Sequence, residues 1–352
     1  MKMDTAQTLA APLSVHDAVD ADAAAWQAFV LAHPRATFFH RFEWRALIAE
    51  QWRHQPHFLI ARRGDRIVGV LPLATMKTRL FGAALVSLPF CVYGGPLTDD
   101  PEALAQLDAR ALEIAQREHV GHVEYRSLRR EHADWPGSDL YVTFRKSIAP
   151  SDDENMKAIP RKQRAMVRKG IANGLSASFE DVDAFFPIYA DNVHRHGTPG
   201  MPLSWFRALK DAFGEHCDTL VVRDPAGNPL SAVVSFWFRD EVLPYYAGDY
   251  ESARGLAAND FKYWRLMCEA AARGCTLFDY GRSKVGTGPY AFKKNWGFEP
   301  TPLAYEYRLL TADGVPQNNP LNPKYRLMIE TWRRLPRPVV NWLGPRVVRG
   351  LG

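Results

Sequence analysis

The stretch that most constrains this chain is residues 275–300, where a short apolar run, a polar loop with three glycines and a basic helix follow one another. The apolar run 276–278 predicts a buried strand. Glycines permit backbone conformations that other residues avoid, and Phe292 and Trp296 stand four residues apart, so they can pack inward as a pair. Because ligands of open α/β sheets bind beyond strand ends, we predict a functional site here. The alternative is a solvated loop and a surface helix with ordinary lysines.

The composition predicts a folded protein of two domains. The chain has 352 residues, of which 47% are hydrophobic and 12% aromatic, enough for large cores. The four cysteines form no C-x-x-C pair, and no cluster of His, Asp or Glu has the spacing of metal ligands, so we expect no metal. Charges near the start replace the apolar core of a secretory signal, and we therefore expect a cytoplasmic protein.

The positive charge lies in the tail. The net charge is +5, and residues 317–352 alone contain seven Lys or Arg and one Glu, so the rest is close to neutral and we expect no DNA partner. In the tail the basic residues alternate with Trp332, Trp342 and aliphatic side chains, a pattern that suits peripheral contact with an anionic membrane at its inner face. The alternative is an extension packed over the body. Five prolines prevent one continuous helix.

The order of predicted elements repeats along the chain, which indicates an α/β fold of two tandem units with mixed sheets. In the first half, a hairpin (57–75) precedes a strand (84–93), a helix (101–118) and two further strands (122–127 and 140–146). The predicted boundaries are a flexible arm at 1–20, a first domain at 21–150, a second domain at 151–312 and a basic aromatic extension at 313–352.

The second half resembles the core of GNAT-type acyltransferases in its order of elements. A third strand (242–248) leads through a loop (253–259) into a helix (259–273), then the strand and helix described above, and a closing strand (303–310). Backbone amides at the helix start can cradle a phosphate or pyrophosphate, and a plain helix entry is the alternative. The predicted donor-binding residues are Arg254, Gly255, Ala258 and Asn259.

Two such units in tandem resemble the FemAB family of peptidyltransferases, over about residues 25–310. Three segments carry the resemblance: the aromatic segment 39–44 ending in Trp44, the Gly-Pro-x-x-Asp turn 95–99 and the Phe-Lys-x-x-aromatic-Gly helix 292–297. The run RKQRAMVRKG and the ending NPLNPKYR also resemble a branch of the family associated with exosortase/PEP-CTERM and exopolysaccharide systems. Together these segments imply two tandem GNAT-like domains with an active cleft between them.

The resemblance implies transfer of an aminoacyl group from aminoacyl-tRNA to an amine, with Lys293 beside the reacting carbonyl and Asp99 near the acceptor amine. The chemistry agrees, because a cation stabilises a developing oxyanion and a carboxylate orients an amine or accepts its proton. Asp99 and Asp100 before a helix can equally be a cap. If Lys293 is catalytic, we expect Lys293→Met to leave the melting temperature within a few degrees and to abolish activity.

The chain departs from the peptidoglycan-directed members at two positions. They carry a glutamine where His40 stands and, where Ile48 stands, a lysine that helps to bind the phosphates of a nucleotide sugar. A UDP-linked acceptor is therefore in doubt. No helical arm for tRNA is visible either, so acyl-CoA and aminoacyl-tRNA both remain as donor substrates, and we expect no tightly bound cofactor.

Substrate binding is assigned to the loop and to a basic helix. Arg161, Arg164 and Arg168 form a stripe on one helix face after Pro160, which suits phosphate or carboxylate; the alternative is a solvated face. The predicted substrate-binding residues are Arg161, Arg164, Arg168, Tyr246, Asp279, Arg282, Lys284, Tyr290 and Lys294.

The sequence thus predicts an acyltransferase that moves an acyl or aminoacyl group to an amine or hydroxyl of a cell-envelope or exopolysaccharide-related acceptor. The alternative is a non-catalytic adaptor of the same fold at the membrane surface, in polysaccharide assembly or PEP-CTERM protein sorting. The enzyme hypothesis needs Lys293 in a site, whereas the adaptor needs only the tail and an exposed face.

Overall fold

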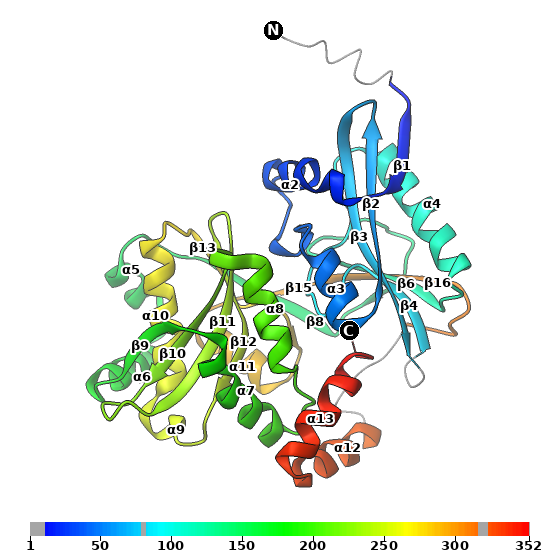
Figure 1. Cartoon of the computed structure of the whole chain (residues 1–352). Coiled ribbons are helices and arrows are strands. Elements are labelled where there is room, and N and C mark those ends of the chain that lie inside the picture. Colours follow the sequence, from blue (N-terminus) through cyan, green and yellow to red (C-terminus); the bar gives the residue numbers. More distant parts are fainter. Residues whose placement is uncertain (1–10, 79–81, 316–322, 352) are drawn as a thin grey trace. The chain divides into compact units, whose positions relative to one another are not determined.

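The computed structural model describes residues 11–78, 82–315 and 323–351, without the side chains of 323–328 (Figure 1). The chain divides into two compact units. Of the described residues, the first comprises 11–78, 82–139, 303–315 and 349–351, and the second comprises 140–302 and 323–348. Each unit contains an eight-stranded sheet in which one pair of neighbours is parallel and the others are antiparallel. The predicted α/β fold with tandem mixed sheets is confirmed.

The first sheet runs in the order β1-β2-β3-β4-β6-β16-β7, with β5 paired to β3. Its strands are β1 (Leu13–Asp17), β2 (Gln55–Arg63), β3 (Arg66–Thr78), β4 (Gly82–Val86), β5 (Leu97–Thr98), β6 (His122–Ser127), β7 (Gly137–Ser138) and β16 (Ala304–Leu309). Its helices are η1 (Asp20–Asp22), α2 (Ala23–Ala32), η2 (Phe38–His40), α3 (Trp44–Trp52) and α4 (Pro101–Arg117).

Helix α4 covers one face of the first sheet (Figure 1). Pro101 occupies its first turn, and the Asp100 carboxylate accepts hydrogen bonds from the amides of Glu102 and Ala103, which fixes where the helix begins. Leu107 and Ile114, wholly buried on the inner face, pack in one core with side chains of β2, β3, β4 and β6.

The second sheet runs in the order β14-β8-β13-β12-β11-β10-β9, with β15 paired to β8. Its strands are β8 (Tyr141–Ser147), β9 (Ser176–Glu180), β10 (Cys217–Arg223), β11 (Pro229–Phe238), β12 (Glu241–Asp249), β13 (Leu277–Asp279), β14 (Ser283–Lys284) and β15 (Pro300–Pro302). Its helices are α5 (Asp152–Ala158), α6 (Arg161–Ala172), α7 (Val182–His196), α8 (Leu203–Phe213), η3 (Gly214–His216), α9 (Ala253–Leu256), α10 (Ala258–Ala272), α11 (Gly288–Asn295), α12 (Pro323–Arg334) and α13 (Arg337–Val348).

Helices α10 and α7 pack on opposite faces of the second sheet. Val242 and Ala247 of β12 pack in the same core as α10, whereas Tyr246 contacts Tyr189 of α7. Residues 242 and 247 are five positions apart, so in a regular strand their side chains would point to opposite faces. A β-bulge between Pro244 and Tyr246 brings them to the same face. A Cβ on Gly248 would lie 2.7 Å from the Tyr189 Cα, so the absence of a side chain lets α7 approach the strand.

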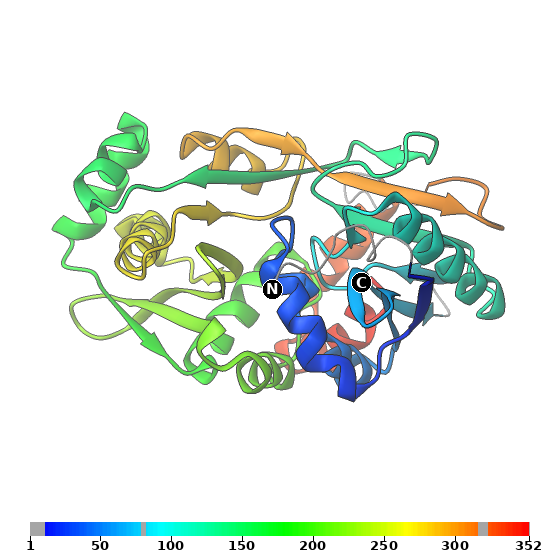
Figure 2. The same cartoon turned by 90° about the horizontal axis from the view of Figure 1, so that it is seen from above.

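Two strands belong to the other unit from the one that the sequence suggested. We expected the strand at 140–146 to close the first domain and the strand at 303–310 to close the second. Instead, β8 lies between β13 and β15 in the second sheet (Figure 2), and β16 pairs with β6 in the first. Phe144 of β8 is buried in the core of the second unit, while the hydroxyl of Tyr305 in β16 donates to the Val92 carbonyl in the first. The predicted boundary near 150 must be corrected accordingly.

The two ends of the chain also differ from expectation. The predicted arm at 1–20 contains β1, which pairs antiparallel with β2 because Leu13 and Val15 pack against the core; residues 1–10 lie outside the described part. The predicted strand 84–93 ends at Val86. The tail forms α12 and α13, separated at Pro336 as the prolines predicted. Among the described residues, no helix is long and apolar enough to cross a membrane.

Candidate functional site

The loop that follows β13 is shaped by Asp279, whose side chain is fully buried. One carboxylate oxygen accepts hydrogen bonds from the Gly281 amide at 2.7 Å and from the Thr143 hydroxyl at 3.3 Å. The other oxygen pairs with Arg145 Nε at 3.0 Å. Gly281 has φ 64°, a left-handed conformation that favours glycine. We predicted that Asp279 binds substrate, but its burial and its partners make it a residue that holds the loop.

Lys293 lies on α11 with its ammonium inside this loop. Nζ donates to the carbonyl oxygens of Tyr280, Gly281 and Arg282, at 2.6, 3.0 and 3.1 Å. The helix is anchored as the four-residue spacing predicted, because Trp296 is fully buried and its ring lies 6.1 Å from that of Phe292. Lys293 therefore meets the backbone just beyond β13. Its catalytic role stays a prediction.

Lys293 is finely balanced between its two protonation states. Burial is the main cause that lowers its pKa to about 7; the nearby Asp279 carboxylate opposes this shift, and the Arg282 guanidinium adds to it. The three carbonyls, in contrast, match the three N–H groups of an ammonium and favour the charged form. Burial and Arg282 also lower the pKa of Lys284, to about 8. A negative charge arriving here would stabilise the protonated form of both lysines.

Aromatic side chains surround these cations. Arg282 lies 4.5 Å above the ring of Tyr141, and Lys284 lies 5.6 Å from the same ring. Lys293 Nζ lies 5.7 Å from the ring of Phe144. We call Arg282, Lys284 and Lys293 the cation cluster. The predicted Tyr290 also packs on Phe144, with ring centroids 5.4 Å apart, whereas Lys294 is exposed.

Tyr141 and Phe144 were not predicted as part of the site. Both lie on β8, which the sequence led us to place in the other domain. Their rings stand three residues apart, which is not the two-residue period of one strand face, so no pattern in the sequence marks them as a pair.

The predicted donor loop contains a short helix that the sequence did not indicate. Arg254 and Gly255 lie exposed in α9, and Ala258 and Asn259 begin α10 after Ala257, which has φ 60°. The first turn of α10 also holds Asp260, whose carboxylate accepts a hydrogen bond from Trp296 Nε1 at 2.9 Å. Burial raises the pKa of Asp260. If the Asp260 carboxylate is ionised, it opposes the binding of a donor phosphate at this helix start. Donor binding here stays a prediction.

Strands β12 and β13 are parallel neighbours over only two residue pairs, Glu241 with Leu277 and Val242 with Phe278. Beyond these pairs comes the bulge that precedes Tyr246. The Tyr246 hydroxyl accepts a hydrogen bond from Trp205 Nε1 at 3.1 Å, so this predicted substrate-binding group already has a partner. Bulges commonly lie beside active sites, where they redirect side chains.

The basic helix divides into structural and exposed residues. Pro160 separates α5 from α6, as the sequence predicted. Arg164 turns back to the end of α5, donating to the carbonyls of Lys157 and Ile159 at 3.1–3.2 Å. Arg161 and Arg168 are exposed. The predicted stripe of three arginines is thus reduced to two that can meet an anion, because Arg164 caps a helix.

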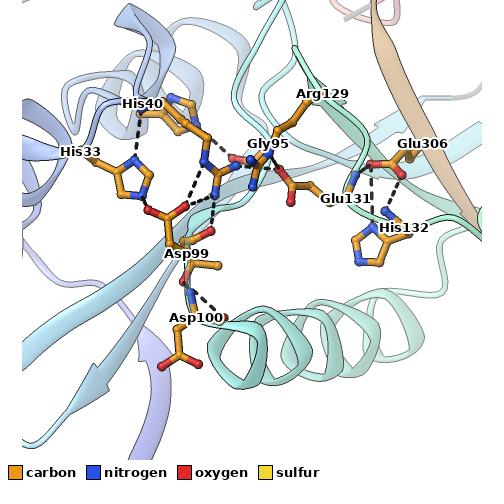
Figure 3. Close-up of polar contacts among 11 residues, drawn as sticks. His33, His40, Gly95, Asp99, Asp100, Arg129, Glu131, His132 and Glu306 are labelled. Carbon is orange, nitrogen blue, oxygen red and sulfur yellow. Dashed lines mark hydrogen bonds and ion pairs between the residues drawn. The ribbon is translucent and has the colours of Figure 1, made fainter. Parts of the chain in front are cut away.

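In the first unit the two aspartates of the Gly-Pro-x-x-Asp turn have different partners (Figure 3). Asp100 caps α4 and pairs with Arg63 at 2.9 Å. Asp99 lies outside the cap: its Oδ1 pairs with Arg35 at 3.0 Å and its Oδ2 lies 3.3 Å from His33 Nε2. Its side chain is 67% exposed. The sequence left open whether these aspartates cap the helix or act as an accessible carboxylate. In the structure Asp100 is the cap and Asp99 is the accessible carboxylate.

Residues distant in sequence hold this carboxylate. Arg35 also pairs with Glu131 at 2.7 Å and donates to the Thr98 carbonyl, so it connects the turn to the segment after β6. His40 Nε2 lies 3.0 Å from the Gly95 carbonyl, and burial lowers its pKa to about 4. We did not predict Arg35, His33 or Glu131, and no local pattern marks them.

The chain was compared with known families and structures. Residues 155–294 match the family model of an acetyltransferase (GNAT) domain. All of these residues lie in the second unit. A search of curated proteins found no match for this chain.

The solved structures similar to this chain share its fold along most of its length. They include FemX (16% identity, TM-score 0.67, covering 90% of this chain and 100% of that one). A tandem GNAT protein from the clavulanic acid biosynthesis pathway is similar at 14% identity and TM-score 0.55, covering 86% and 100%. L-PGS from Bacillus licheniformis is similar at 11% identity and TM-score 0.55, covering 89% and 97%. At these identities the likeness establishes the tandem GNAT fold.

Proposed function

We propose that this protein is an acyltransferase of the FemAB/GNAT type, which moves an acyl or aminoacyl group to an amine or hydroxyl of a cell-envelope or exopolysaccharide-related acceptor. The GNAT match and the fold shared with FemX support the reaction class. The observation that carries the proposal is Lys293, a lysine with a pKa of about 7, held on three carbonyls just beyond a strand end of that domain.

The proposed chemistry uses Lys293 as a cation. The acceptor nitrogen or oxygen adds to the acyl carbonyl carbon, an oxyanion develops, and its collapse breaks the bond to coenzyme A or to the tRNA ribose. The proton that the acceptor loses ends on the leaving group, which departs as the thiol of coenzyme A or the ribose hydroxyl of tRNA. An ammonium beside the oxyanion stabilises that charge. Because the three N–H groups of Lys293 already donate to carbonyls, the oxyanion must displace one of these weaker acceptors or act through space.

Arg282 and Lys284 suit the negative charges of the donor or acceptor. Arg282 lies near both Lys284 and Lys293, since it lowers the pKa of each lysine. A bound phosphate or carboxylate would relieve this repulsion and favour the charged form of Lys293. Binding of the anionic substrate would then favour the protonation of Lys293 that the proposed chemistry needs.

We propose that Asp99 orients the acceptor amine. Its exposed carboxylate is fixed by Arg35 and by His33, so it can receive an ammonium or amine in a defined direction. Asp100 cannot take this role, because it caps α4.

The acceptor we propose is not a UDP-linked peptidoglycan precursor. Ile48 stands where peptidoglycan-directed FemAB members have a phosphate-binding lysine, and Ile48 is fully buried. His40 is buried as well and holds the Gly95 carbonyl. An acceptor of the exopolysaccharide or PEP-CTERM systems is consistent with these two replacements. We place the reaction in the cytoplasm, where acyl-CoA and aminoacyl-tRNA are made.

Complementation tests this proposal without knowledge of the donor. A strain deleted for the gene is scored for envelope and exopolysaccharide phenotypes after expression of the wild type, Lys293→Met or Lys294→Met. Lys294 is the matched control, because it is adjacent but exposed. We expect Lys294→Met to complement and Lys293→Met to fail at equal protein level. Full complementation by a folded Lys293→Met protein would favour the adaptor hypothesis.

A further inference from the structure

Helix α13 has a buried stripe and an apolar, basic stripe on its opposite side. Val340, Gly344 and Val348 are buried at four-residue spacing. Gly344 lies so close to the second unit that a Cβ would be 3.1 Å from the Gly200 carbonyl. This stripe, with the ion pair between Arg337 and Asp191 of α7, attaches the helix to its own unit.

The other stripe consists of Val339, Trp342 and Arg346, which we call the outer stripe. At 100° per residue these three positions point away from the buried stripe. Trp342 is 62% exposed and Val339 is 40% exposed, and Trp342 has the largest exposed fraction among the described bulky apolar residues. Arg346 lies 4.0 Å above the Trp342 ring, so a cation and an indole form one surface.

Arginines predominate in the segment that carries the outer stripe. Between residues 329 and 348 the chain has Arg333, Arg334, Arg337 and Arg346 against Glu330 alone. Arg337 pairs with Asp191, whereas Arg333 and Arg334 are exposed. A tryptophan beside arginines suits the headgroup level of a bilayer, where the indole is partly wet and the cations meet phosphate. A protein partner would need acidic side chains placed beside an apolar patch to match this surface. An anionic bilayer offers phosphates beside acyl chains at every point of its surface.

We propose that the outer stripe of α13 docks the protein on an anionic phospholipid surface. The buried stripe keeps the helix on its unit while the outer stripe inserts Trp342 and Val339 at the headgroup boundary. Each arginine near the surface adds electrostatic attraction, which salt weakens. This inference does not depend on the proposed transferase activity.

Co-sedimentation of the full chain with vesicles tests the proposal. Vesicles contain equal parts of phosphatidylglycerol and phosphatidylcholine, or phosphatidylcholine alone. We expect binding to the anionic vesicles, weakened by salt. The double variant Val339→Ser/Trp342→Ser should bind about tenfold more weakly or worse, and Arg346→Gln about fivefold more weakly. Leu31→Ser, which removes a half-exposed leucine of α2, is the control and should bind like the wild type.

Three results would overturn the proposal. One is equal binding of the double variant and the wild type to anionic vesicles, at unchanged melting temperature. Another is equal wild-type binding to neutral and anionic vesicles at low salt. The third is a concentration-dependent dimer of the wild type in solution that the double variant does not form. That result would assign the outer stripe to contact with a second copy of the chain.

Discussion

Replacing Lys293 by methionine should change how the stability of the protein depends on pH. Burial lowers the Lys293 pKa from 10.5 to about 7. The unfolded chain therefore binds more protons than the folded one between these values, so the wild type gains stability as the pH rises. At about 1.4 kcal/mol for each pH unit, and with a reduction for partial exposure, we expect a gain of about 2–3 kcal/mol between pH 7 and pH 9.5 over Lys293→Met.

The assay is equilibrium unfolding in guanidinium chloride at several pH values for the wild type, Lys293→Met and Lys294→Met. At pH 9.5 Lys293→Met should be clearly the less stable, because the loop carbonyls lose a donor that even the neutral amine supplies through its two N–H groups. This revises our expectation of an unchanged melting temperature. The free energy of unfolding of Lys294→Met should depend on pH in the same way as that of the wild type. The reasoning is refuted if the free energies of unfolding of the wild type and Lys293→Met differ by a constant amount across this range.

Two further predictions concern the first unit. Asp100→Ala should lower stability by about 1–2 kcal/mol, because α4 loses its cap, while Asp99→Ala should keep the melting temperature and lose complementation; thermal melts and complementation that give the reverse order contradict this assignment. Gly95→Ala should destabilise the unit by about 1–3 kcal/mol, because its Cβ would lie 1.9 Å from Ser127 Oγ; calorimetry of Gly95→Ala/Ser127→Ala should recover part of the loss, and no recovery would point to another cause.

Local patterns were sufficient for much of the fold. The hairpin of β2 and β3, the capped helix α4, strand β6 and helix α10 all lie within a few residues of their predicted positions. Each has a period or a terminal signal in its own sequence. The loop after β13 was found in the same way, from its glycines and from the spacing of Phe292 and Trp296.

What the sequence could not predict depends on contacts between distant residues. The residues of β8 do not show which sheet the strand joins. Only its pairing with β13 and β15 assigns it to the second sheet. The three carbonyls around Lys293 belong to the backbone and leave no mark in the sequence. Arg35 reaches Asp99 across 64 positions of the chain.

The most direct test of the account is group transfer itself. The purified full chain is incubated with labelled acyl-CoA or labelled aminoacyl-tRNA and an envelope extract from the deletion strain, and label is measured on the acceptor fraction. We predict transfer by the wild type and by Lys294→Met, and a rate about two to three orders of magnitude lower for Lys293→Met. No transfer above a boiled-protein control with either class of donor, or equal rates for Lys293→Met and the wild type, would contradict the central claim.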